Sequence, residues 1–214
     1  MADISNAVGA ERVSRIVGYQ ITKGSYSEGG VNLPMRVAVL GAANHANQAG
    51  LGLDPSPAVI TSANEAAELY GYGSPLHQMA RILRPLLGGG IGGIPTVFYP
   101  QLEAAGATAS SIDVAVTGTA TKNVAHRLRI NGRTNVDGEY YEFVVTPTDD
   151  AAAIRTKIID AVNNVTNSPV TASLSTSVVR LTTKWYGATS AELTVAVDTL
   201  NDSSGLTYTV SNKI

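Results

Sequence analysis

The sequence contains no cysteine and few charged residues. Since none of its 214 residues is a cysteine, disulfides, thiolate nucleophiles and sulfur metal ligands are excluded. Charged residues make up 15% of the chain, below the roughly 25% of average soluble domains. Fifteen Lys plus Arg against 17 Asp plus Glu give a formal net charge of -2. The chain therefore has no basic field to attract nucleic acid, and we expect no direct nucleic-acid partner.

The sequence also lacks a targeting or membrane segment. Its first residues, MADISNAVGAERVSR, contain no apolar stretch of signal-peptide length, so we expect synthesis in the cytoplasm. The longest uncharged run, residues 85 to 102, contains five glycines and three prolines and would make a poor membrane helix. No membrane insertion is expected. A weakly charged surface suits chains that pack against each other, although secreted β-rich modules share it.

The pattern predicts an α+β fold: a β-α-β (α/β) first domain followed by a mostly antiparallel β-domain carrying one helix. Residues 1–30 form an extended N-terminal arm, because Val13, Val17, Tyr19 and Ile21 alternate like an edge strand before a glycine-rich tract. Residues 31–105 form the α/β segment, and residues 106–214 form the β-rich domain. The boundary falls near Glu103, where Thr, Val, Ala and Ser with period-two alternation take over.

Within the α/β segment, the apolar run RVAVLGAA (residues 36–43) predicts a strand buried on both faces. Ser62 to Glu65 form a capping box at the start of one helix, and Ser74 with Pro75 begins a second. A short buried strand follows at residues 94–99. Strand, helices and strand make a unit whose two strands should be parallel, with a right-handed crossover.

Gly88, Gly90 and Gly93 have the G-x-G-x-x-G spacing of a dinucleotide-binding turn. In such a turn the glycines follow a strand and open a helix, whose first N–H groups bind the phosphate. Here they follow the predicted second helix, which Pro85 ends or kinks, and they precede a strand. We therefore interpret them as a helix end and a connection.

In the β-rich part, alternation predicts strands around residues 112–116, 124–130, 140–145, 170–174, 178–185, 193–197 and 206–210. Thr148, Asp149 and Asp150 should cap one helix. Its predicted buried face consists of Ile154, Ile158, Ala161 and Val165.

No combination of residues predicts a catalytic, cofactor or metal site. His45, His77 and His126 lie far apart in the sequence, and none belongs to a pair at metal-ligand spacing. Capping explains Asp149 and Asp150 without acid–base chemistry, and it explains Ser74 without a nucleophile.

Two surface hypotheses stay open beside simpler explanations. Arg127, Arg129 and Arg133 could contact an acidic partner, but alternation favours the wet face of a half-buried sheet. Trp185 and Tyr186 could stack on a sugar, but an aromatic pair at a strand end is more often part of the core and its rim.

Several phrases, in order, resemble the N-terminal part of tail sheath proteins from contractile-tailed bacteriophages. They are VNLPMRVAVLG, VITSANEAAELYGYGSPLHQMARIL and GGIPTVFYP. The later segments SSIDVAVTGTATKN, TPTDDAAAIRTKIIDAVNN and VVRLTTKWYGATSAELTVAV resemble the outward-projecting β-rich domain inserted in these proteins. The resemblance runs from about residue 12 to the end and depends on the order of the phrases, with no single diagnostic site.

The resemblance implies a structural protein of the virion, assembled in the host cytoplasm, with no enzymatic activity and no cofactor. Its subunits form stacked rings around a tail tube and contract to drive the tube through the host envelope. The implied partners are other copies of the chain, the tail tube protein, and the baseplate and tail terminator proteins. The family links subunits by extended arms that add strands to a neighbour's sheet. The candidate inter-subunit arm residues are Arg12, Val13, Arg15, Val17, Tyr19 and Ile21.

One departure and one alternative remain. Sheath proteins usually continue after the inserted domain into a region that completes the first domain, whereas this sequence stops at Ile214. The α/β segment is therefore expected to be incomplete, as in an N-terminal fragment, a proteolysis product or a shortened relative. The alternative function is a β-rich surface or secreted binding module without enzymatic activity, which the β-α-β segment and the missing signal oppose.

Overall fold

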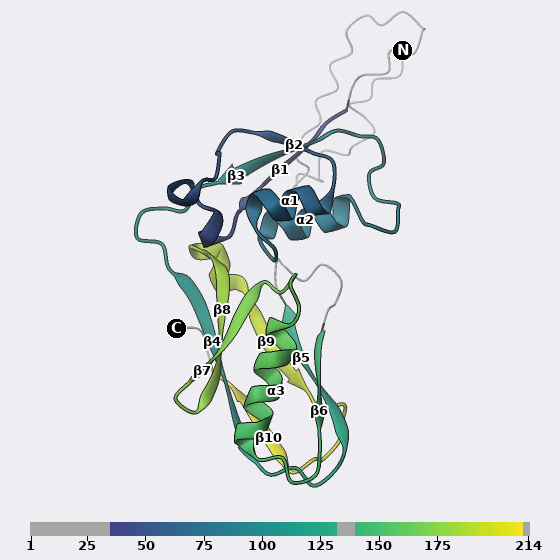
Figure 1. Ribbon diagram of the computed structural model, residues 1–214, viewed down its shortest axis with the longest axis vertical. Helices are drawn as coiled ribbons and strands as arrows, with labels where there is room; N and C mark the ends of the chain where they lie inside the picture. Colours follow the sequence, from purple (N-terminus) through teal and green to yellow (C-terminus); the bar gives the residue numbers. More distant parts are fainter. Residues whose placement is uncertain (1–34, 132–139, 212–214) are drawn as a thin grey trace, which may run out of the picture. The chain divides into compact units, whose positions relative to one another are not determined.

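The computed structural model describes residues 35–131 and 140–211. Within these ranges the chain is a mixed α+β protein with three α-helices and ten strands in three sheets (Figure 1). Most strand pairs are antiparallel. None of the helices in the described part of the chain is long and apolar enough to cross a membrane.

The first sheet has the strand order β1-β3-β2, with β1 at Val37–Ala42, β3 at Thr96–Gln101 and β2 at Ala58–Ile60. β1 and β3 are parallel, with Val37 opposite Thr96, which confirms the predicted parallel pairing. β2 pairs antiparallel with β3 and was not predicted, because three residues are too few for a period-two pattern. Two short 3-10 helices, His45–Asn47 and Ala49–Leu51, were also missed in the connection after β1.

The two helices of this segment begin where the sequence predicts. α1 spans Ala63–Tyr70, and the Ser62 hydroxyl accepts a hydrogen bond from the Glu65 N–H at 3.1 Å. α2 spans Pro75–Leu83, with Ser74 as its N-cap. It ends just before Arg84 and Pro85, since a residue preceding proline is disfavoured in the helical conformation.

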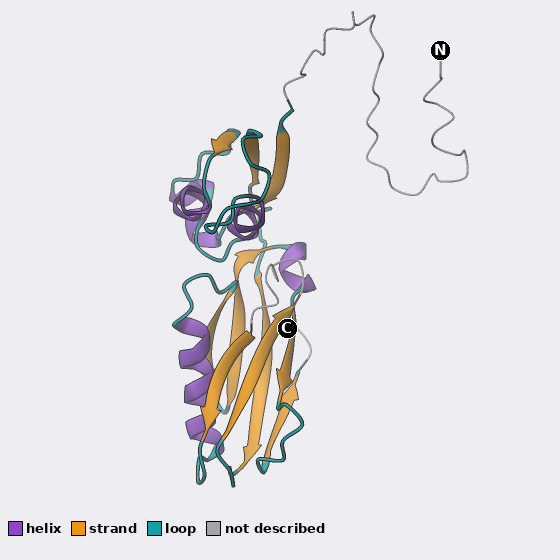
Figure 2. Cartoon of the chain, turned by 90° about the vertical axis from the view of Figure 1, so that its right-hand side faces the viewer, coloured by secondary structure: helices purple, strands orange, loops and turns teal. Residues whose placement is uncertain are grey.

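Both helices lie on the same face of the first sheet (Figures 1 and 2). They enclose a core that includes Ile60, Leu76 and Phe98, each fully buried. The expectation that β1 is buried on both faces is wrong, because Leu40 points away from the helices and is 57% exposed. The apolar run therefore contains a strand that the helices cover on one face only.

Seven strands form the other two sheets, and every pairing in them is antiparallel. The strands are β4 (Ala109–Gly118), β5 (Val124–Asn131), β6 (Tyr140–Val145), β7 (Val170–Ser175), β8 (Val178–Tyr186), β9 (Thr194–Asp198) and β10 (Leu206–Val210). The sheet orders are β10-β4-β8-β7 and β6-β5-β9. Each predicted strand is present, with ends that differ by a few residues. α3, at Ala151–Asn163, runs alongside these strands (Figure 2).

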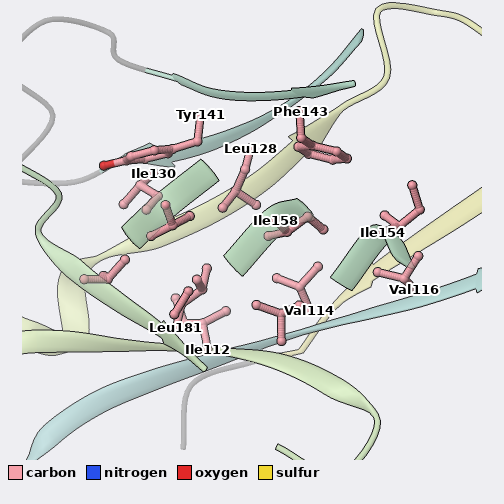
Figure 3. Packing of buried hydrophobic residues seen from close by; sticks show 14 of the residues in the cluster. Ile112, Val114, Val116, Leu128, Ile130, Tyr141, Phe143, Ile154, Ile158 and Leu181 are labelled. Atoms are coloured by element: carbon pink, nitrogen blue, oxygen red, sulfur yellow. The ribbon is translucent and has the colours of Figure 1, made fainter. Parts of the chain in front are cut away.

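The inner faces of these two sheets and one face of α3 make a second core (Figure 3). Ile154 and Ile158 of α3 are fully buried, as predicted. The predicted face was wrong at its end, because Val165 lies beyond the helix and is 38% exposed, while Val162 is fully buried instead. Val162 follows Ile158 by four residues, which places both on one face of a regular helix.

The two cores meet through polar contacts around the turn between α1 and α2. The Gln78 side-chain amide donates to the Asn167 carbonyl at 2.8 Å. The Lys184 ammonium donates to the Tyr72 carbonyl at 3.4 Å and the Thr166 carbonyl at 3.3 Å. The buried residues form two separate clusters, and Ala42 at the end of β1 also packs against the second one. The predicted domain boundary near Glu103 stays a prediction.

Gly73 allows the closest approach at this junction. Its φ is +81°, and a Cβ on it would lie 2.0 Å from the Ser168 carbonyl oxygen. Both the backbone conformation and the lack of space therefore require glycine.

The replacement Ile158→Ala should lower the free energy of unfolding by roughly 2 to 5 kcal/mol, since it leaves a cavity in the second core. Chemical denaturation monitored by circular dichroism measures the loss. Val165→Ala is the matched control and should change stability by less than about 0.5 kcal/mol, because Val165 lies outside the core. Equal losses in the two variants would show that the face of α3 is assigned wrongly.

The replacement Gly73→Ala should destabilise the chain by more than about 1 kcal/mol, since it adds a clash to a strained backbone conformation. Gly92→Ala is the control, because Gly92 also has a positive φ, of +60°, but a Cβ added to it would meet no atom within 4 Å. Thermal unfolding of both variants separates the clash from the backbone strain. Similar losses would mean that the contact with Ser168 is unimportant.

Candidate assembly surface

The arm residues singled out in the sequence, Arg12 to Ile21, lie outside the described residues. Their pairing with a neighbouring subunit therefore stays a prediction. The structure does describe a surface to which such an arm could bind as an added strand. This surface lies around β1.

One face of the first sheet exposes large apolar side chains. Besides Leu40, the outward-pointing residues Val59 and Tyr99 are 55% and 40% exposed. Leu40 lies opposite Tyr99 on the neighbouring strand, and Val59 lies opposite Val97, so these side chains gather across all three strands. Sheets with parallel strands are normally covered on both faces. Within residues 35–131 and 140–211, no second layer covers these side chains.

The edge of β1 is also open, because no other described strand pairs with its outer side. An apolar groove of about 280 Å³ runs beside this edge. Its lining comes from β1 and α2, namely Ala38, Val39, Leu40, Met79, Ile82 and Leu83. Ile82 is 55% exposed on the helix side. An extended segment placed here could bond to the β1 main chain and bury apolar side chains in the groove.

None of the described residues that line this groove is titratable, so the groove offers binding without acid–base chemistry. The glycine-rich connection after α2 has a structural explanation as well. Its glycines follow α2 and precede β3, as predicted. A Cβ on Gly90 would lie 2.2 Å from the Leu83 carbonyl oxygen, and the Ile91 N–H donates to that same oxygen at 3.2 Å. Gly90 therefore serves the end of α2.

The three histidines lie in three different surroundings. His45 stacks on Tyr186, with ring centroids 3.9 Å apart, and bonds to the Glu103 carboxylate at 2.7 Å. His126 is buried against Tyr208, whose hydroxyl lies 2.7 Å from Nδ1, and burial lowers the pKa of His126. The described residues contain no group of three or more His, Cys, Asp or Glu side chains that could hold a metal ion.

His77 is a buried residue of α2. Its Nδ1 accepts a hydrogen bond from the Gly73 N–H at 3.0 Å. Burial lowers the pKa of His77 to about 4, and the nearby positive charges of Arg81 and Lys184 add to the shift. The ring is therefore neutral at pH 7, with its hydrogen on Nε2.

Only one of the two aspartates caps α3 as predicted, because the Asp149 carboxylate bonds to Thr146 and Lys157 instead. Asp150 is the N-cap, and its carboxylate accepts from the Ala153 N–H at 2.8 Å. Hydrogen bonds from Lys157 and from the Thr146 N–H lower the pKa of Asp149 to about 2. Both carboxylates therefore have structural partners.

The arginines of β5 occupy the wet face of their sheet. Arg127 bonds to Glu142 at 3.0 Å, and Arg129 bonds to Asp198 at the same distance. Leu128, between them, is fully buried on the opposite face. Arg133 lies outside the described residues. Trp185 is 1% exposed and belongs to the second core, as the simpler explanation predicted.

Sequence reasoning missed the features that only neighbours in space create. The open face around Leu40 was read as buried, because an apolar run gives no sign of how many layers cover it. The stacking of His45 on Tyr186 joins residues 141 positions apart, and no spacing rule connects them.

The chain should lose stability as the pH falls from about 6.5 to about 4. The unfolded state binds a proton at His77 near pH 6.5 and the folded state only near pH 4. Stability from the neutral ring is thus complete above pH 6.5 and is lost over this window, by up to about 3 kcal/mol. Denaturation of the wild type and His77→Asn across this range measures it. His126 is present in both proteins, so identical pH profiles would contradict the assignment.

Comparison with known proteins does not assign a family. No protein-family model matches the chain, and a search of curated proteins found no matching sequence. The functional argument therefore depends on the geometry of the chain itself: an exposed apolar sheet face, an open strand edge and an apolar groove beside that edge.

Proposed function

We propose that this chain is a structural subunit that polymerises with copies of itself, as a tail sheath protein of a contractile bacteriophage tail. In this role it surrounds a tail tube and shortens to drive the tube through the host envelope. The tube protein, baseplate and tail terminator proteins are the further partners of the proposal. The resemblance of the sequence supplies this specific form of assembly.

A single observation carries the proposal: in the described part of the chain, apolar side chains of the first sheet are exposed on one face, and the outer edge of β1 is unpaired. Burying a large apolar side chain such as Leu40 contributes about 1.5 to 3 kcal/mol. An added strand along β1 would also satisfy main-chain groups that no described strand pairs with. These gains are available to a neighbouring subunit, and its segment Arg12 to Ile21 has the alternation of such a strand.

The competing function is a β-rich surface or secreted binding module without enzymatic activity. It would use the β-rich part as its binding surface and would not need the open edge of β1. The location of self-association separates the two functions. Self-association through β1 supports the sheath subunit. A chain that is monomeric, with or without substitutions on β1, supports the binding module.

The wild-type chain should self-associate at high protein concentration, and Leu40→Lys should abolish that association without lowering the melting temperature. A lysine in the groove places a charge where apolar side chains would be buried. Deletion of residues 1–21 should have the same effect if the arm is the inserted strand. Sedimentation velocity measures the association, and electron microscopy tests for rings or tubes.

The matched control is Val144→Lys, because Val144 on β6 is 58% exposed, much like Leu40, but does not line the groove. This variant should associate as the wild type does. A wild type that stays monomeric, or equal effects of the two lysine variants, would contradict assembly through β1.

A further inference from the structure

A second pocket, with a volume of about 290 Å³, lies on the other side of α2. Its wall includes Ala63 and Asn64 at the start of α1, and His77 and Arg84 from α2 and its end. Asn167, which follows α3, also contributes. No aspartate or glutamate is among its described lining residues.

The start of α1 presents two free donors to this pocket. The Ser62 hydroxyl accepts from the Glu65 N–H, and the Ser62 carbonyl accepts from the Ala66 N–H. The N–H groups of Ala63 and Asn64 have no acceptor among the described residues. The first turn of a helix leaves such donors unpaired, and its dipole favours a negative group beside them.

His77 supplies an independent and stronger sign of a ligand. Its side chain is one of the wall residues although the residue is only 2% exposed. Since Nδ1 accepts from the Gly73 N–H, Nε2 carries the hydrogen, and this second donor has no partner among the described residues. Nε2 is not one of the fully enclosed atoms that lack a partner, so it keeps some open surface, and His77 lines the pocket. A ligand oxygen in the pocket could accept this hydrogen.

Arg84 adds a positive charge that no described carboxylate neutralises. Its two terminal nitrogens donate to the carbonyls of Gly92 and Ile94, which holds the guanidinium in place. Its Nε is buried and has no hydrogen-bond partner in the described part of the chain. Because its fork is already engaged, Arg84 provides charge more than a two-pronged grip on a phosphate.

We propose that this pocket binds a carboxylate attached to a small apolar body. The oxygens would accept from the N–H groups of Ala63 and Asn64 and from His77 Nε2, beside the charge of Arg84. These donors match the acceptor sites of one carboxylate. The apolar body would cover Leu86 and Leu87, which also line the pocket and are 82% and 102% exposed.

The carboxylate can come from the end of a protein chain or from a free organic acid, and the chemistry is the same. The proposal does not depend on assembly through β1, because the two pockets share no lining residue. Self-association and carboxylate binding can therefore succeed or fail separately.

Nuclear magnetic resonance of the full ¹⁵N-labelled chain tests the proposal. The probes are N-acetyl-leucine for a chain end, 4-methylpentanoate for a free acid, N-acetyl-leucinamide as the uncharged match, and inorganic phosphate. At least one carboxylate should produce saturable shifts of the Ala63 and Asn64 amide signals, and the amide should not. The carboxylate that binds more tightly identifies the source. Absence of saturable shifts with both carboxylates, or equal binding of the amide or of phosphate, would overturn the proposal.

Ala63→Pro is the informative variant. It removes one donor at the first helical position, where proline is favoured, and the preceding Ser62 already has the extended conformation that proline requires. We expect its Kd to rise at least about tenfold, as for a hydrogen bond to a charged group. Ala151→Pro makes the same change at the first position of α3 and should bind as the wild type does. Unchanged binding by Ala63→Pro would contradict the site even if the wild type binds.

Discussion

The constraint on which the rest of this structure depends is that two helices cover only one face of the β1-β3-β2 sheet. Side chains on the covered face, such as Phe98, form a complete small core. Those on the other face, such as Leu40 and Tyr99, are as apolar but remain in water. The same strands therefore contribute to the core of the segment on one face and to an exposed apolar surface on the other. A second layer from another chain or segment would complete the usual environment of parallel strands.

The second constraint is the polar junction at the turn between α1 and α2. Gly73 brings the backbone against Ser168, and Lys184 satisfies two carbonyls there. Partial burial lowers the pKa of the Lys184 ammonium. The two carbonyl acceptors hold the ammonium at this junction. The fully buried residues thus form two separate clusters, which this junction and the packing of Ala42 against the second cluster connect.

The two surfaces on either side of α2 have opposite chemistry. The groove beside β1 is apolar and suits an extended segment of a protein chain. The pocket at the start of α1 presents donors and positive charge, and suits a carboxylate. α2 contributes to both because different residues lie around its circumference, with exposed Ile82 in one direction and buried His77 in another. A single short helix therefore separates two binding surfaces that different ligands can occupy.

The sequence alone determined the local structure. Period-two alternation gave β4 to β10, and capping by Ser62, Ser74 and Asp150 placed the helix starts, because these signals act between residues close in the chain. Only the tertiary structure decided that Leu40 is exposed, that Val162 is buried in place of Val165, and that Gly73 meets Ser168. Burial and close approach depend on which elements pack against one another. Local sequence patterns do not show which distant elements these are.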